Sequence, residues 1–152
     1  MPRSKQVAAL PWRRGKAGVE ILLITTRTTK RWVIPKGWPM DGKADHDAAA
    51  QEAFEEAGVQ GVVSSESLGD YCYFRVSDKG NARQIKVTVY PLRVDHELSD
   101  WPERAERERR WMGCSDAAAL AGEPELVAVL SNFVEPPTRR GFWQWLLGLF
   151  RS

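Results

Sequence analysis

One stretch limits what this chain can fold into more than any other: residues 48–57, which read AAAQEAFEEA. Alanine and glutamate favour helix, Asp45 or Asp47 offers an N-cap, and Gly58 is a natural residue to end a helix. The preceding residues 37–42 contain a proline between two flanking glycines, which interrupts both strand and helix. The sequence therefore predicts a loop that leads into a helix ending at Gly58.

Three glutamates of this helix share one side of it. At about 100° per residue, Glu55 and Glu56 lie about 60° and 40° to either side of Glu52. The opposite side is apolar, and we expect it to pack on a sheet: Ala50, Ala53, Phe54 and Ala57. Carboxylate oxygens that converge at one point suit Mg²⁺, which commonly binds substrate phosphates as well. The alternative is that these glutamates form only a solvated face, as on many surface helices.

The rest of the chain alternates between expected strands and helices. Branched and aromatic runs predict strands over residues 6–12, 20–26, 32–34, 61–63, 70–76 and 85–94, the last two as a hairpin around residues 78–81. Residues 99–110 predict a solvated loop or short helix, because Glu103/Arg107 and Arg104/Glu108 stand at helical spacing. Further helices are expected over residues 116–121, with Ser115 as N-cap, and over residues 123–133.

Length and composition predict one globular domain with a separate tail. The 152 residues are 28% charged and 43% hydrophobic, which suits a soluble domain that buries a core without disulfides. Cys72 and Cys114 match neither a zinc knuckle nor a secreted disulfide scaffold, and charges break the first apolar run before a signal peptide is complete. We expect a domain over residues 1–138, a tail over residues 139–152, and a cytoplasmic location.

Charge and histidine content narrow the function. The formal net charge is only +2, so we expect no stable nucleic-acid complex. His46 and His96 are the only histidines of the sequence, too few for clustered-histidine metal sites and weak support for a Ser-His-Asp triad. The chemistry is therefore expected to depend on carboxylates.

A phosphate-binding P-loop is the first alternative for residues 37–44, GWPMDGKA. Ala44 lacks the hydroxyl that would bind Mg²⁺, and Pro39 removes a backbone N–H that would hold phosphate. No clear apolar strand ending in a Walker-B aspartate follows. These features disfavour a P-loop kinase or NTPase.

Residues 37–59 resemble the Nudix box, a pattern with fixed glycine, glutamate and arginine positions. The positions in register are Gly37, Glu52, Glu55, Glu56, Gly58 and Val59. The departures are Lys43 for a glutamate, Gln51 for an arginine and Ala53 for a larger aliphatic residue. If the family's glutamate and arginine pair with each other, Lys43 and Gln51 are a paired adjustment that avoids two cations in contact.

The resemblance implies a fold and an activity. The implied fold is α+β, a Nudix-type α/β/α sandwich with a mixed sheet and a carboxylate-bearing helix. The implied activity is hydrolysis of a phosphoanhydride bond with Mg²⁺, or Mn²⁺ in its place, held by Glu52, Glu55 and Glu56 and by a backbone carbonyl at Lys36 or Gly37. The same glutamates are the implied catalytic residues. The alternative is a Nudix-like module that binds a phosphorylated ligand without turnover, which Lys43 and Gln51 would support.

Flanking matches are similar to the diphosphoinositol polyphosphate phosphohydrolase and diadenosine polyphosphate hydrolase branch. They are Thr26-Arg27, residues 30–35 (KRWVIP), residues 98–101 (LSDW) and residues 107–112 (RERRWM). By this resemblance Arg27 and Arg107 bind substrate phosphates, Lys36 looks like the diadenosine hydrolases, and Arg3 or Lys5 stands for an N-terminal basic cluster. The alternative is that Arg27 and Arg107 are ordinary surface residues. Trp12, Trp38 and Tyr73 are candidates either for stacking on adenine or for the core.

The tail is expected to be an amphipathic helix. Large apolar residues fill an arc of about 200° on a helical projection: Phe142, Trp143, Trp145, Leu146, Leu147, Leu149 and Phe150. With arginines beside them, such residues suit a membrane surface, but they are too few to span a bilayer. The alternatives are packing on the domain itself or across a homodimer.

Overall fold

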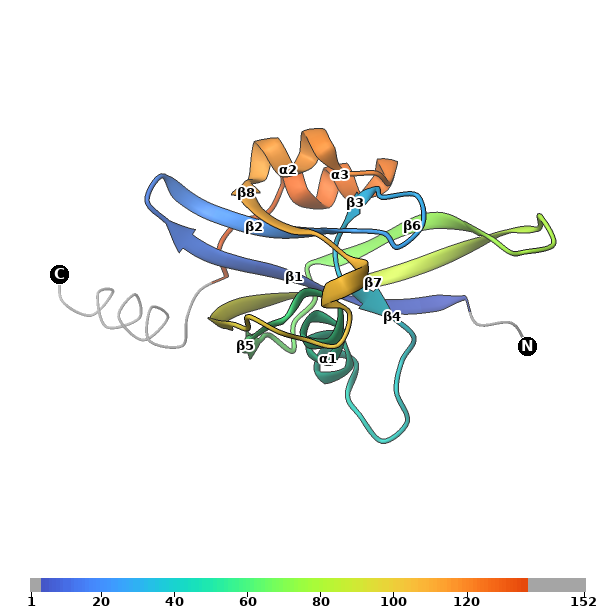
Figure 1. Ribbon diagram of the computed structural model, residues 1–152, viewed down its shortest axis with the longest axis horizontal. Coiled ribbons are helices and arrows are strands. Elements are labelled where there is room, and N and C mark those ends of the chain that lie inside the picture. Colours follow the sequence, from blue (N-terminus) through green and yellow to red (C-terminus); the bar gives the residue numbers. More distant parts are fainter. Residues whose placement is uncertain (1–3, 137–152) are drawn as a thin grey trace, which may run out of the picture.

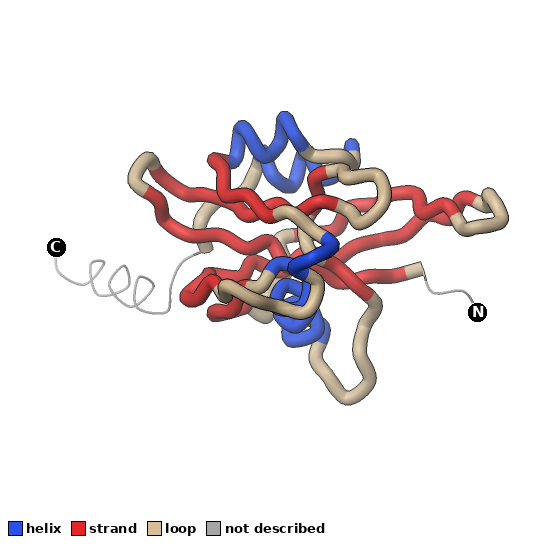
Figure 2. Tube along the Cα trace, viewed as in Figure 1, coloured by secondary structure: helices blue, strands red, loops and turns tan. Residues whose placement is uncertain are grey.

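A mixed β-sheet forms the middle of the molecule (Figures 1 and 2). The computed structural model describes residues 4–136, and within that range the sheet has eight strands. They are β1 (Lys5–Gly15), β2 (Gly18–Thr25), β3 (Trp32–Val33), β4 (Lys36–Gly37), β5 (Val59–Val63), β6 (Gly69–Val76), β7 (Ala82–Glu97) and β8 (Arg109–Gly113). The order is β3-β2-β1-β7-β5, with β4 on β1, β6 on β7 and β8 on β2. β1 and β7 run parallel, and the other pairs are antiparallel.

Helices cover both faces of this sheet. Figure 1 shows α1 (Asp45–Ala57) below it, and α2 (Cys114–Leu120) and α3 (Pro124–Ser131) above it. A single 3₁₀ turn, η1 (Arg104–Glu106), precedes β8. The predicted α/β/α sandwich with a mixed sheet is confirmed.

β1 divides the core between the two faces, because successive side chains of a strand point to opposite sides. Val7 and Ala9 pack in the cluster under α1, which is lined by the buried alanines 48, 49, 53 and 57. Ala8, Leu10 and Trp12 pack in the cluster under α2 and α3, which holds Leu126, Leu130 and Phe133. The small alanine side chains let α1 lie close to the sheet, and this closeness positions the glutamates that the helix also carries.

The predicted helix caps are wrong in detail. The N-cap of α1 is Ala44, without a side-chain hydrogen bond, and Asp45 and Asp47 lie in the first turn, where the helix dipole favours acids. The N-cap of α2 is Gly113 rather than Ser115, and α3 is shorter than residues 123–133. Gly58 ends α1 in the left-handed conformation, with φ of 66°, as predicted.

Two short strands stand where the sequence predicted loops. β4 pairs with β1 and includes Gly37, the first residue of the predicted loop, which stands opposite Val7. β8 begins within the charged residues 99–110 and pairs with β2, with Met112 opposite Ile21. The alternating charges hid β8, because Met112 is the one buried residue of its five.

The predicted tail, residues 139–152, lies outside the described residues, as does Arg3. In residues 4–136 no helix is long and apolar enough to cross a membrane. Cys72 and Cys114 are free thiols, as expected.

Candidate active site

An open pocket of about 620 Å³ gathers every predicted site residue except Lys5. The predicted residues that line it are Arg27, Lys36, Gly37, Glu52, Glu55, Glu56 and Arg107. They come from the β2–β3 loop, β4, α1 and the segment before β8. Lys5 starts β1 as an exposed residue and is not part of the pocket lining.

The last turn of α1 is held in place by the segment that follows β7. The Trp101 ring lies so close to Gly58 that a Cβ atom there would collide with it. The Trp101 Nε1–H donates a hydrogen bond to the Glu56 carbonyl at 3.2 Å, and the Arg109 guanidinium lies 4.0 Å from the Trp101 ring centroid. Gly58 is therefore needed both for its positive φ and for space, and these contacts fix the turn that carries the glutamates.

Gly37 lets a carboxylate approach the backbone of β4. A Cβ atom at this position would collide with the carboxylate of Glu52. A larger residue would force Glu52 away from the strand. The glycine of the Nudix-like pattern therefore has a physical reason in this chain: it brings the Glu52 carboxylate against β4.

Glu52 and Glu56 are two neighbouring carboxyl groups of α1 that line the pocket and influence each other's pKa. Glu56 is only 7% exposed, and burial raises its pKa to about 9, against the opposing charge of Arg107 and with help from the hydrogen bond to Glu52. Burial also raises the pKa of Glu52. The Lys36 backbone N–H donates to Glu56 Oε1 at 3.3 Å, and Arg107 Nη2 lies 3.7 Å from the same oxygen. The three glutamates thus do not share one exposed face, because Glu56 lies on the buried side of α1.

This carboxyl pair fits a divalent cation. Two carboxyl groups that must share a proton when buried together are stabilised in their charged form when a cation takes the proton's place. Across residues 4–136 no group of three or more histidine, cysteine, aspartate or glutamate side chains is assembled as a complete set of metal ligands. The arrangement suits Mg²⁺, which is often bound through one or two carboxylates with water and phosphate oxygens as its other ligands.

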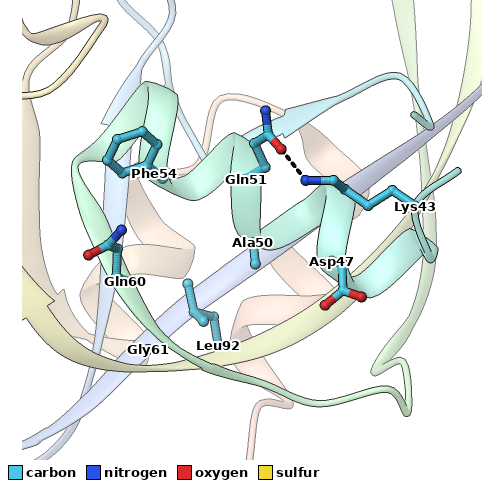
Figure 3. Close-up of a pocket in the computed structure, with 8 residues that line it drawn as sticks. All are labelled: Lys43, Asp47, Ala50, Gln51, Phe54, Gln60, Gly61 and Leu92. Carbon is cyan, nitrogen blue, oxygen red and sulfur yellow. Dashed lines mark hydrogen bonds between the residues drawn. The ribbon is translucent and has the colours of Figure 1, made fainter. Parts of the chain in front are cut away.

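The Glu55 side chain is held by a hydrogen bond from Gln51, which lies on the outer side of α1. Gln51 Nε2 donates to Glu55 Oε1 at 3.0 Å, and Lys43 Nζ donates to Gln51 Oε1. Figure 3 shows this Lys43–Gln51 pair at the edge of a second pocket. Ala53 and Ala57 are buried, as the predicted apolar side requires, whereas Ala50 and Phe54 are half-buried and line that pocket together with Gln60, Gly61 and Leu92 of β5 and β7.

Of the four cations assigned to the substrate, Arg27, Lys36, Arg107 and Lys5, the three that line the pocket have acidic partners. The Arg107 side chain is 10% exposed, with its Nη2 3.0 Å from Glu103 Oε1, and its Nη1 donates to the Thr25 carbonyl at 3.1 Å. The Arg27 side chain is 58% exposed, with its Nη2 2.8 Å from the same Glu103 oxygen. Lys36 Nζ lies 3.5 Å from Glu123 and 4.8 Å from the Tyr73 ring centroid, and burial lowers its pKa. Arg107 and Lys36 thus balance buried carboxylates, whereas Arg27 reaches solvent.

Several pocket residues were missed from the sequence. They are the acids Glu103 and Glu123, the arginines Arg31 and Arg75, and Trp38, which was named only as a candidate for stacking or core. Glu123 was read as the start of a helix, but its side chain is buried and accepts a hydrogen bond from the Tyr71 hydroxyl at 3.0 Å. The helical spacing of Glu103 and Arg107 was the sequence feature that could have placed Glu103 in the site, and this pair forms. The other pair at that spacing does not form, because Arg104 lies 3.8 Å from Asp100 instead of pairing with Glu108.

Comparison with known proteins gives consistent results. The NUDIX domain model matches residues 2–133. Nudix hydrolase 12, mitochondrial, of Arabidopsis thaliana is 33% identical over 119 residues, which are 76% of this chain and 59% of that protein. Diphosphoinositol polyphosphate phosphohydrolase 3-beta of Bos taurus is 30% identical over 115 residues, 74% of this chain and 66% of that protein. The chain spans 59%, 63% and 65% of the length of three plant relatives that it matches.

Solved structures agree on the fold. A binary complex of C. elegans Ap4A hydrolase superposes with a TM-score of 0.62 at 21% identity, covering 95% of this chain and 98% of that one. A NUDIX hydrolase from Nitrosomonas europaea gives a TM-score of 0.64 at 16% identity, covering 86% and 87%. At such low identities the likeness concerns the fold alone.

Proposed function

This chain belongs to the Nudix family, and from that premise we propose that it is a hydrolase that cleaves a phosphoanhydride bond in a substrate with several phosphates. The observation that carries the proposal is the Glu52–Glu56 carboxyl pair in a pocket whose walls also carry cations. Carboxylates that favour a divalent cation, beside guanidinium groups that bind phosphate, suit a polyphosphorylated substrate. Diadenosine polyphosphates and diphosphoinositol polyphosphates are the substrate classes that we favour.

In the proposed reaction, water attacks a bridging phosphoryl group above the carboxyl pair. Glu52 and Glu56 would hold Mg²⁺, or Mn²⁺ in its place, with the backbone next to Gly37 as a further ligand. When bound, the cation supplies charge neutralisation on the phosphate oxygens and a lowered pKa of the attacking water. One of Glu52, Glu55 and Glu56 accepts the proton of the water.

The cations of the pocket divide the remaining work. Arg107 lowers the free-energy cost of ionising Glu56, because its Nη2 lies 3.7 Å from Glu56 Oε1 in a buried position. Arg27 is exposed enough to leave Glu103 and bind a phosphate through two parallel hydrogen bonds. Lys36 forms an ion pair with Glu123, so the charges of these two residues in the pocket wall cancel. The substrate is thus oriented by Arg27, while Arg107 and Lys36 act on the carboxylates.

The test is hydrolysis by the full chain with Mg²⁺ or Mn²⁺. The panel is a diadenosine polyphosphate, a diphosphoinositol polyphosphate, capped RNA, a nucleoside triphosphate and ADP-ribose, with product release measured for each. We expect turnover of at least one of the first two and its loss in EDTA. Binding of these compounds without turnover under any of the conditions would instead support the non-catalytic module.

The tail leads to a separate proposal about partners. Its apolar and arginine residues suit contact with a membrane surface or with a second copy of the chain. The full chain and a version ending at Thr138 are compared by co-sedimentation with anionic liposomes and by mass in solution. Equal mass and no sedimentation for both would reject each form of contact.

A further inference from the structure

Two arginines of the β6–β7 hairpin converge on one tryptophan. Arg75 in β6 stands directly opposite Arg83 in β7 in the strand register. The guanidinium carbons of Arg75 and Arg83 lie 5.4 Å and 5.7 Å from the ring centroid of Trp38, which follows β4. Residues from three separate parts of the chain therefore form one cluster, which we call the Trp38 cluster.

The two arginines of the Trp38 cluster lack acidic partners. Neither forms an ion pair with any residue between 4 and 136. Like charges directly opposite each other on paired strands repel, and no acidic side chain of residues 4–136 is paired with either arginine to neutralise them. The Nε atom of Arg83 is also buried without a hydrogen-bond partner in the described structure. An anion that accepts hydrogen bonds from the two guanidinium groups would relieve the repulsion between them.

The cluster adjoins the candidate active site. Trp38 and Arg75 line the same pocket as Glu52 and Glu56. Arg75 and Arg83 also line another open pocket, of about 670 Å³, along the hairpin. The contrast with Arg27, Arg107 and Lys36 is direct, because those three cations already have carboxylate partners in the pocket. An anionic ligand that extends from the glutamates toward β6 and β7 would meet the Trp38 cluster, where two arginines have no acidic partner among residues 4–136.

We propose that Trp38, Arg75 and Arg83 form a second phosphate subsite, which binds a phosphate group of the substrate remote from the bond that is cleaved. A guanidinium binds phosphate oxygens through two parallel hydrogen bonds, and Trp38 keeps both side chains aimed at the same place. The subsite makes the enzyme prefer substrates with phosphates beyond the cleaved anhydride. Its role in catalysis rests on the proposed function, but its ability to bind phosphate does not.

The test is direct binding of inorganic tetrapolyphosphate to the full-length protein in EDTA, measured by calorimetry. The variant is Arg75→Gln with Arg83→Gln. The matched control is Arg93→Gln with Arg104→Gln, which removes the same charge from exposed arginines that pair with Asp95 and Asp100 and lie outside both pockets. We expect the cluster variant to bind at least about tenfold more weakly than wild type and the control less than about twofold, because each charge-assisted hydrogen bond is worth at least that factor.

Three results would overturn the subsite. They are wild-type protein that does not bind tetrapolyphosphate, a cluster variant that binds like wild type, and a control that loses as much affinity as the cluster variant. Arg75→Gln alone, at an exposed position, repeats the measurement if the double variant does not fold. A further result would separate the two proposals. If the wild-type protein hydrolyses no substrate, but binds tetrapolyphosphate and loses that binding in the cluster variant, the proposed function is rejected and the subsite is retained. In an active enzyme, we expect the cluster variant to raise KM for the most highly phosphorylated substrate and to leave kcat within about twofold.

Discussion

The two sides of the thirteen-residue helix α1 lie in different environments. On the pocket side, Glu52 and Glu56 lie half-buried and buried beside Arg107, and their pKa values are raised by burial. On the outer side, the half-buried Gln51 and Phe54 border an open pocket with the exposed Lys43 (Figure 3). The cost of replacing a residue should therefore depend on which side of the helix it lies.

The match to the family pattern divides along the same line. The glutamates that match the pattern line the candidate active site, whereas Lys43 and Gln51, two of its departures, pair with each other on the outer side. The sides are still connected, because Gln51 also donates to Glu55. We therefore expect the outer side to accept other residues at positions 43 and 51, provided that these two residues still pair and residue 51 still contacts Glu55.

The largest effect is expected on the pocket side. Glu56→Gln should lower turnover at least about a hundredfold, because it removes charge from the carboxyl pair that would hold the cation. The same variant should unfold at a higher temperature in EDTA at pH 8, since an amide does not need a proton to be buried. Glu66→Gln, in an exposed loop, is the control for both measurements. Near-normal turnover in Glu56→Gln would reject the role of the pair.

Arg107 and Arg27 provide the next test. Arg107→Ala breaks the ion pair with Glu103, in which both side chains are largely buried, and should cost about 3–5 kcal/mol of unfolding free energy in urea. Arg27→Ala should cost less than about 1 kcal/mol, because its ion pair is exposed. Arg27→Ala should instead raise KM for polyphosphorylated substrates. Equal stability losses for the two variants would contradict this division between a buried structural cation and an exposed substrate-binding cation.

The pH dependence of stability isolates Glu56. Its pKa in the folded protein, about 9, lies above the ordinary value of 4.5, so the stabilisation it provides is complete below pH 4.5 and is lost as pH rises through 9. In EDTA, the free energy of unfolding of wild type minus that of Glu56→Gln should therefore fall steadily over this range. Urea unfolding at several pH values measures this difference. A flat difference would mean that Glu56 is ionised in the folded protein throughout.

The sequence predicted well those features that depend on local patterns. The helix over residues 48–57, its end at Gly58 and most strands follow from helix propensity and alternation, and the structure contains them. β8 was missed because it is held by pairing with β2 rather than by its own apolar residues. The burial of Glu56 was missed for a related reason: a helical projection gives the angle between side chains, but the depth of each depends on where the sheet lies.

The candidate site shows the same limit. Gly37 and the glutamates of the pocket stand at the spacings that the sequence showed, and so does the Glu103–Arg107 pair. Arg75 and Glu123 gave no signal, because they reach the pocket only through the pairing of β6 with β7 and the placement of α3. Contacts between segments far apart in the chain produce no periodic pattern in the sequence from which they could be predicted.

The smallest effect is expected on the outer side, where a reciprocal exchange tests the pairing. Gln51→Arg alone places a second cation against Lys43 and should lower the unfolding free energy by less than about 1 kcal/mol, since the pair is exposed. Adding Lys43→Glu to Gln51→Arg restores an attractive pair and should recover the loss, with turnover within about twofold of wild type throughout. The double-mutant cycle is measured by urea unfolding, with Asp47→Asn as a control on the same helix. Independent effects of the two changes would show that Lys43 and Gln51 do not act as a pair. A large loss of turnover in the double variant would show that the outer side sets the position of Glu55, and the two sides of α1 would then work as one site.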